Sequence, residues 1–214
     1  SSLQTVRRLG AGTRMQRALP ISARQKIDSW RRPLSRLADE QQGIEEDLLQ
    51  IQLGGPVGDL ASFGDEGLLL KERMAERLGL GWSEGCWHTD RSALMAFCQW
   101  LARISASTGK FGMDVALMAQ NEVGDVRLGS AGGSSAMPHK QNPVQAEILV
   151  SLARFCAGQL GVLQQAALHE NERSGISWTM EWMTLPSFVV AVAGSVRIAA
   201  ELAANIEEIR SAEG

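Results

Sequence analysis

Apolar residues recur every three or four positions through most of the chain, whereas the strict alternation typical of half-buried strands is nearly absent. This period predicts an all-α protein. The predicted helices cover residues 22 to about 52, 68–80, 89 to about 123, 143 onward, and a last segment from about 178 or 186 to 209. Pro33 lies inside the first helix and is expected to kink or split it. Apolar stripes on helices this long pack mainly against one another, so we expect an elongated bundle of long helices.

Glycine-rich breaks separate the predicted helices at residues 53–58 and 124–133, and the short helix is expected to end at the glycines of 79–81. Small residues in the last helix suggest close packing between helices: Ala191, Ala193, Gly194 and Ala199. We expect the chain to oligomerise through its long helices.

The composition excludes several classes of function. A formal net charge of −3 over 214 residues provides no basic stripe for a nucleic-acid backbone, so no nucleic-acid partner is expected. The longest uncharged stretches are about 15 residues, which predicts no membrane span. No signal peptide is recognisable, which predicts a cytoplasmic location. Three widely spaced cysteines predict buried free thiols rather than disulfides.

Polar groups are concentrated in the loop from Gly132 to Pro143, whose sequence is GGSSAMPHKQNP. A glycine-rich arm can close over a substrate, the adjacent hydroxyls of Ser134 and Ser135 can reach a proton, and Lys140 can point at an oxyanion. Pro143 then opens a helix whose free N–H groups favour negative charge. The same composition fits an interhelical loop with a helix cap equally well.

The order of residues in this loop resembles the signature G-S-S-x-M-P-x-K-x-N of the fumarase/aspartase superfamily, from Gly133 to Asn142. The resemblance implies an all-α homotetramer whose active sites are shared between subunits, and addition or elimination beside a carboxylate without a metal or organic cofactor. It implies that Ser134 is the catalytic base. Lys140 and Asn142 would stabilise the enediolate charge, and Ser135 and Met137 would bind substrate.

A second segment, residues 11–22, resembles the superfamily pattern G-x-T-H-x-Q-x-A-x-P-x-T, but Arg14 stands where most of these lyases have histidine. Hydroxide and amine leaving groups need a proton donor, and arginine cannot donate a proton near neutral pH. A carboxylate leaving group, as in lactone opening, needs no strong acid, and Arg14 can bind it through two hydrogen bonds. The departure therefore favours the branch of the 3-carboxy-cis,cis-muconate cycloisomerases, intramolecular lyases of protocatechuate breakdown in the β-ketoadipate pathway. Thr13 and Gln16 are further binding candidates.

Further resemblance to this branch lies in residues 52–58, in Trp-His-Thr-Asp-Arg at 87–91 and in His-Glu-Asn-Glu-Arg at 169–173. We expect Arg173 to contact an anionic substrate. His88 fits substrate contact and a capping or packing role equally well. His169 has Glu170 and Arg173 nearby on a predicted helix end, where a structural ion pair is the default interpretation. The three histidines are scattered and no Cys/His spacing suits a metal, so none is expected.

The resemblance covers essentially the whole chain but begins near the family's second conserved region. Residues 1–214 are therefore interpreted as a central helical-bundle domain that lacks the family's N-terminal lobe and most of its C-terminal hairpin. The expected activity is conversion of 3-carboxy-cis,cis-muconate, a small tricarboxylate, to 4-carboxymuconolactone. The alternatives are adenylosuccinate lyase or another fumarate-releasing lyase, and a non-catalytic helical scaffold.

Overall fold

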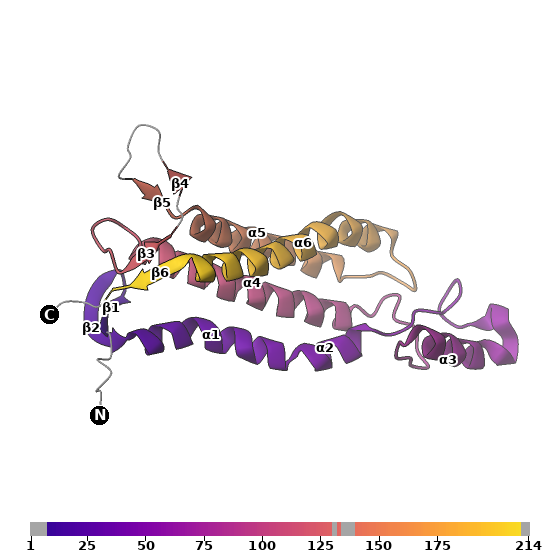
Figure 1. Ribbon diagram of the computed structural model, residues 1–214. Coiled ribbons are helices and arrows are strands. Elements are labelled where there is room, and N and C mark those ends of the chain that lie inside the picture. The colour runs from indigo at the N-terminus through magenta and orange to yellow at the C-terminus, as the bar shows by residue number, and fades with distance from the viewer. Residues whose placement is uncertain (1–7, 130–131, 134–139, 211–214) are drawn as a thin grey trace, which may run out of the picture. The chain divides into compact units, whose positions relative to one another are not determined.

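The computed structural model describes residues 8–129, 132–133 and 140–210. Most of this part is helical, which confirms the predicted all-α class (Figure 1). The helices are α1 (Ala23–Asp39), α2 (Gln41–Leu48), a 3-10 helix η1 (Ala61–Glu66), α3 (Gly67–Leu78), α4 (Ser92–Met118), α5 (Val144–Ala166) and α6 (Gly175–Asn205). The strands form three antiparallel pairs, β1 (Arg8–Thr13) with β2 (Gln16–Ser22), β3 (Val126–Leu128) with β6 (Ile206–Ile209), and β4 (Gly132–Gly133) with β5 (Gln141–Asn142).

The chain divides into two compact units. The first contains Ser1–Arg36, Ile104–Phe155 and Ala191–Gly214, and the second contains Leu37–Arg103 and Cys156–Val190. The single central domain proposed above stays a prediction.

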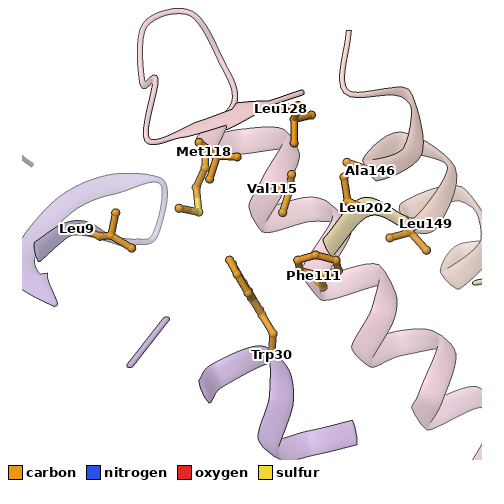
Figure 2. Packing of buried hydrophobic residues seen from close by; sticks show 10 residues of the cluster. Leu9, Trp30, Phe111, Val115, Met118, Leu128, Ala146, Leu149 and Leu202 are labelled. Carbon is orange, nitrogen blue, oxygen red and sulfur yellow. The ribbon is translucent and has the colours of Figure 1, made fainter. Parts of the chain in front are cut away.

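The core of the first unit joins helices to the small strands. Its buried apolar residues come from β1, α1, α4, β3, α5 and α6 (Figure 2). They are Leu9, Trp30, Phe111, Val115, Met118, Val126, Leu128, Ala146, Leu149 and Leu202. The Trp30 and Phe111 rings meet edge to face with centroids 5.0 Å apart. The β1–β2 hairpin is therefore fastened to the helices through Leu9, which is almost fully buried.

Helices α4 and α5 approach closely in the first unit at two glycines. A Cβ placed on Gly112 would lie 2.7 Å from the backbone oxygen of Ala146 and 2.7 Å from Cβ of Leu149. A Cβ on Gly109 would meet Cβ of Ala153. Nothing lies within 4 Å of the corresponding position on Gly194. The closest approach at a glycine is thus between α4 and α5, whereas α6 packs in this unit through Ala199, which lies against the core, and through Ser195, whose Oγ lies 3.2 Å from Thr108 Oγ1 of α4.

Helix α1 is continuous through Pro33, so of the two expected outcomes, a kink or a split, the split does not occur. Ser22, the residue before α1, caps the helix, because its Oγ accepts a hydrogen bond from the backbone N–H of Gln25 at 3.1 Å. The interruption occurs at Glu40, between α1 and α2.

The second unit contains α2, η1, α3 and the adjoining parts of α1, α4, α5 and α6. Helix α3 ends at Gly79, which takes the left-handed conformation (φ 66°), as the glycine signal predicted. Trp100 Nε1 donates to the Leu37 backbone oxygen at 2.8 Å, and Arg103 makes two hydrogen bonds to the Glu40 carboxylate. These contacts fasten α4 to the α1–α2 junction. Cys98 and Cys156 are buried and Cys86 is half-buried, and all three are free, as predicted.

Helices α5 and α6 have the length and composition of membrane spans, with mean hydropathies of 1.4 and 1.6 in their most apolar windows. Only 22% and 28% of those windows are buried in the structure. Core helices of water-soluble bundles pass the same test of length and composition. Most of the residues in these two apolar windows are therefore not buried within a single chain.

Candidate functional site

The signature loop has a short ladder at its base. Gly133 pairs with Gln141 and Gly132 pairs with Asn142. A Cβ on Gly132 would lie 2.6 Å from Cγ2 of Val144, so a larger residue would push the ladder away from the start of α5. Three predicted site residues, Ser134, Ser135 and Met137, together with His139, lie outside the described residues. The ladder brings the two ends of their segment together.

Lys140 and Asn142 lie beside a cleft of about 300 Å³ at the end of α4. The cleft is also lined by Gln120, Pro143 and Glu147. Lys140 is exposed, and Asn142 is half-buried in the ladder next to the first turn of α5. The first backbone N–H groups of a helix have no partner inside the helix, and they favour negative charge. An ammonium, an amide and a helix start thus converge where an oxyanion could be stabilised.

Arg14 stands at the tip of the β1–β2 hairpin. Thr13 pairs with Gln16, so the turn between them is Arg14-Met15, and both residues have positive φ (49° and 65°). This conformation is that of the two-residue turns which normally prefer asparagine and glycine. Thr13, Arg14 and Gln16 are all exposed.

A second cleft, of about 340 Å³, lies under the hairpin and is lined by Gln16 and Lys26 among others. Leu117 and Gln120 line this cleft and also the one beside Lys140. The hairpin and the base of the signature loop therefore flank the same end of α4. Of the predicted residues, Gln16 lines the cleft under the hairpin, and Lys140 and Asn142 line the cleft at the loop base. Thr13 and Arg14 belong to the hairpin and its turn but line neither cleft.

Below the hairpin, Asp114 of α4 holds three donors. Its Oδ2 accepts hydrogen bonds from Trp30 Nε1 at 2.7 Å and Lys110 Nζ at 2.6 Å, and Lys26 Nζ lies 3.0 Å away. Burial raises the pKa of the Asp114 carboxyl, but the hydrogen bonds from Lys110, Trp30 and Lys26 outweigh it and hold the pKa below its ordinary value. This cluster, which the sequence analysis missed, fixes the start of α1 against α4.

His88 and Arg173 meet in the second unit. Arg173 Nη2 lies 3.2 Å from Nε2 and 3.4 Å from Nδ1 of His88, and donates to the backbone oxygen of Gly55 at 2.8 Å. Its guanidinium lies over the ring of Trp178, 5.3 Å from the centroid, and His88 meets the same ring edge to face. Burial, and then the positive charges of Arg173 and Arg91, lower the pKa of His88 below its ordinary value. A neutral imidazole can accept a hydrogen bond from Arg173.

Comparison with known proteins agrees with this architecture. Residues 9–158 match the family described as Lyase. The chain belongs to this lyase family. It is 37% identical over 202 residues to the 3-carboxy-cis,cis-muconate cycloisomerase of Pseudomonas aeruginosa, covering 93% of this chain and 44% of that enzyme.

Two solved structures of the lyase fold are similar to the described chain. The 3-carboxy-cis,cis-muconate lactonizing enzyme of Pseudomonas putida gives a TM-score of 0.88 at 38% identity, covering 94% of this chain and 45% of that one. A fumarate lyase from Mesorhizobium sp. BNC1 gives 0.86 at 28% identity, with 95% and 45% covered. The resemblance inferred from the signature loop and from Arg14 is therefore confirmed. The chain spans less than half the length of these relatives.

Some of the predicted site residues lie near one another within each unit. Their catalytic and binding roles stay predictions. The hairpin and loop-base residues belong to the first unit, and His88 and Arg173 belong to the second. Within the described ranges, no group of three or more His, Cys, Asp or Glu residues is arranged to hold a metal ion.

Two buried ionic features were not anticipated. His169 contacts Glu181, with Nε2 3.4 Å from Oε1, and neither Glu170 nor Arg173 is its partner in that contact. It lies in the connection after α5 and not on a helix end. Lys71 of α3 is 1% exposed and donates to the backbone oxygen of Gly85 at 2.5 Å. Burial lowers the pKa of Lys71 below its ordinary value, and the neighbouring Cys86 opposes the shift.

Proposed function

We propose that this lyase is a cycloisomerase that converts 3-carboxy-cis,cis-muconate to 4-carboxymuconolactone. A carboxylate oxygen of the substrate forms a C–O bond at one end of a C=C bond, and Ser134 gives a proton to the carbon beside another carboxylate. No atom is lost, so the step is an isomerisation. In reverse, Ser134 takes the proton and the lactone oxygen leaves as carboxylate.

The observation that carries the proposal is the arginine at the hairpin tip. A lyase that expels an amine or hydroxide needs an acid there, and a guanidinium does not release its proton near neutral pH. Arg14 is exposed at the tip of the hairpin, and its neighbours Met15 and Gln16 line the cleft that shares Leu117 and Gln120 with the cleft beside Lys140. A planar guanidinium at this place suits a departing carboxylate. Four relatives named 3-carboxy-cis,cis-muconate cycloisomerase, 34–38% identical to this chain, support the same substrate.

Charge stabilisation is the main task in this reaction. Removing a proton beside a carboxylate adds a second negative charge to it, and each preorganised donor aimed at such a charge is worth roughly 3 kcal/mol in the transition state. Lys140, Asn142 and the first N–H groups of α5 are the donors we assign to it. Thr13, Gln16, Ser135 and Met137 are assigned to binding, and His88 with Arg173 to a further carboxylate. No metal or organic cofactor is assigned a role.

Completion of the site by self-association is part of the proposal. Exposed apolar residues recur at seven-residue spacing on α6 as Ile176, Met183 and Val190, which are 72%, 77% and 71% exposed. On α5, Ile148, Phe155 and Val162 recur at the same spacing and are 39%, 43% and 38% exposed. Such stripes are typical of helices that pack against other helices. We assign these stripes to the interfaces of a homotetramer in which several copies contribute to each active site. We place the protein in the cytoplasm. Sedimentation of the purified protein tests the assembly.

Replacement of Ser134 by alanine tests the chemistry. We expect turnover of 3-carboxy-cis,cis-muconate, followed by loss of the diene absorbance, to fall roughly 10²–10⁴-fold, the range for loss of a general acid–base group. Ser151→Ala is the matched control, because Ser151 is exposed on α5 and its hydroxyl donates to Glu147 of its own helix. Near-normal turnover in Ser134→Ala would refute the assignment.

A fumarate-releasing lyase is the second candidate, and the Mesorhizobium fumarate lyase at 28% identity favours it. Absorbance loss without fumarate formation supports the cycloisomerase. Fumarate released from an added succinyl compound supports the lyase. A purified protein that turns over neither would favour a non-catalytic scaffold.

A further inference from the structure

Three buried side chains in the second unit form an ionic contact that the proposed chemistry does not use. Arg91 donates to the Glu181 carboxylate through Nε at 2.8 Å and through Nη2 at 2.7 Å, and the two side chains are 9% and 7% exposed. His169 Nε2 lies 3.4 Å from Glu181 Oε1, and its side chain is fully buried. We refer to Arg91, Glu181 and His169 as the buried triad.

Stability alone gives a poor account of the buried triad. Buried ion pairs can often be replaced by apolar side chains without loss of stability, because desolvation offsets most of the attraction. Moreover, His169 Nδ1 is buried and makes no hydrogen bond within the described structure. A buried polar atom without a partner is destabilising. A buried histidine with one unpaired nitrogen is therefore better explained by a role in positioning the segments that it joins.

The buried triad joins three segments. Arg91 follows the stretch that carries His88, donates to the Trp87 backbone oxygen at 3.4 Å and lies over the Trp87 ring, 5.2 Å from its centroid. His169 belongs to the connection between α5 and α6, residues 167–174, which also carries Arg173. Glu181 lies on α6 and holds both of the others.

The same connection is tied to α6 by a second contact. Ser177 Oγ donates to the backbone oxygen of Leu168 at 2.7 Å, and the Ser177 backbone N–H donates to Ser174 Oγ at 3.1 Å. Ser174 and Ser177 are both buried. The connection is thus anchored on either side of Arg173 by neutral hydrogen bonds and by His169.

The ring of Trp178 lies between α6 and the two residues Arg173 and His88, and it contacts both of them. Trp178 lies three residues before Glu181 on α6, so the two share a helix face. One face of α6 therefore contacts Arg91 and His169 through Glu181, and His88 and Arg173 through Trp178.

We propose that His169 is a positioning residue. Through Glu181 and Arg91 it holds the 167–174 connection so that Arg173 stays against His88 and Trp178, where the guanidinium and the imidazole receive a carboxylate of the substrate. The carboxylate-binding role of His88 and Arg173 belongs to the proposed function, and this inference rests on it.

Replacement of His169 by phenylalanine tests the proposal. Phenylalanine keeps a ring of similar size, removes the donor to Glu181 and also removes the unpaired Nδ1. We expect the melting temperature to be unchanged or higher, KM for 3-carboxy-cis,cis-muconate to rise about tenfold, and kcat to change less than threefold. His169→Gln, which keeps a donor, is expected to restore much of the KM. An unchanged KM in a folded His169→Phe protein would overturn the proposal.

A spectroscopic measurement separates this proposal from the proposed function, because it needs no substrate. With only three histidines in the chain, the His88 ring can be assigned by substitution and titrated by NMR. Loosening the connection moves Arg173 away, so the pKa of His88 is expected to rise toward its ordinary value in His169→Phe. An unchanged His88 titration overturns the positioning role. A raised value in a protein inactive on muconate supports the positioning role while rejecting the cycloisomerase.

A second variant covers the case in which His169→Phe does not fold. Ser177→Ala removes the hydrogen bond to Leu168 without changing charge, and it is expected to shift KM and the His88 titration in the same directions. Trp100→Phe is the control for a general loss of stability in this unit, because it removes the hydrogen bond to Leu37 and part of the ring that stacks on Phe97 without touching the 167–174 connection. Equal KM effects in Ser177→Ala and Trp100→Phe would overturn the proposal.

Discussion

Gly112→Ala should destabilise the protein although alanine is the better helix former. A new Cβ would lie 2.7 Å from the Ala146 backbone oxygen, 2.7 Å from Leu149 Cβ and 3.4 Å from Leu149 Cδ1. Carbon atoms normally pack at about 3.5–4.0 Å, so α4 and α5 would have to separate locally by up to about 1 Å. Two of the three obstructing atoms lie on the backbone or at Cβ and cannot rotate away.

Two opposing terms set the magnitude. Overpacking of this kind costs about 1–3 kcal/mol, and the rigid neighbours at Gly112 place it at the upper end. Exchange of glycine for alanine inside a helix stabilises by about 1 kcal/mol. The expected net loss is about 2 kcal/mol, which corresponds to a fall of about 4–8 °C in melting temperature for a chain of this size.

Gly43→Ala is the matched control for Gly112→Ala. Gly43 is exposed in α2 and has nothing within 4 Å of its Cβ position, so we expect the substitution to stabilise by about 1 kcal/mol or less. Urea and thermal unfolding of the two variants measure the difference. If Gly112→Ala is as stable as Gly43→Ala, the inferred close approach of α4 and α5 is wrong.

Two further predictions concern the candidate site. Lys140→Met should lower turnover at least 10²-fold, as loss of one oxyanion donor does, without changing the melting temperature, because Lys140 is exposed; a large change in melting temperature would contradict the assigned role. Burial, Arg173 and Arg91 lower the pKa of His88 in the folded state. The neutral ring therefore contributes to the free energy of unfolding above about pH 6.5, the ordinary pKa of histidine. This contribution is lost as the pH falls from there toward the folded pKa. His88→Gln should therefore flatten the dependence of unfolding free energy on pH between about 5 and 7, and an identical profile in the variant would contradict the shift.

The sequence predicted the helices well because their signal is local. The glycine stop at Gly79 and the first-turn proline at Pro143 both lie within two residues of helix ends in the structure. Strands β3 and β6 were missed because they are short and far apart in the sequence. Ile206–Ile209 reads as the last turn of a helix, and only its pairing with Val126–Leu128 makes it a strand. The β1–β2 hairpin was missed because its turn is Arg-Met instead of asparagine and glycine.

The site shows the same division between local and distant information. Ser134, Lys140 and Asn142 could be named because their motif is continuous in sequence. The contact of Arg91 with Glu181 joins residues 90 positions apart, and no pattern within either segment identifies the partner. His169 was expected to pair with a neighbour in sequence, whereas packing of the 167–174 connection onto α6 brings it to Glu181.

The backbone conformation of the Arg14-Met15 turn does not depend on which side chain stands at position 14. A positive φ at a residue other than glycine costs about 1 kcal/mol or more, whichever ordinary side chain the residue carries. The backbone of this turn is set by strand pairing on both sides and by the burial of Leu9. A proton donor and a permanent cation are therefore interchangeable at position 14 at little conformational cost, so one scaffold could acquire a new leaving group by substitution at this single exposed position.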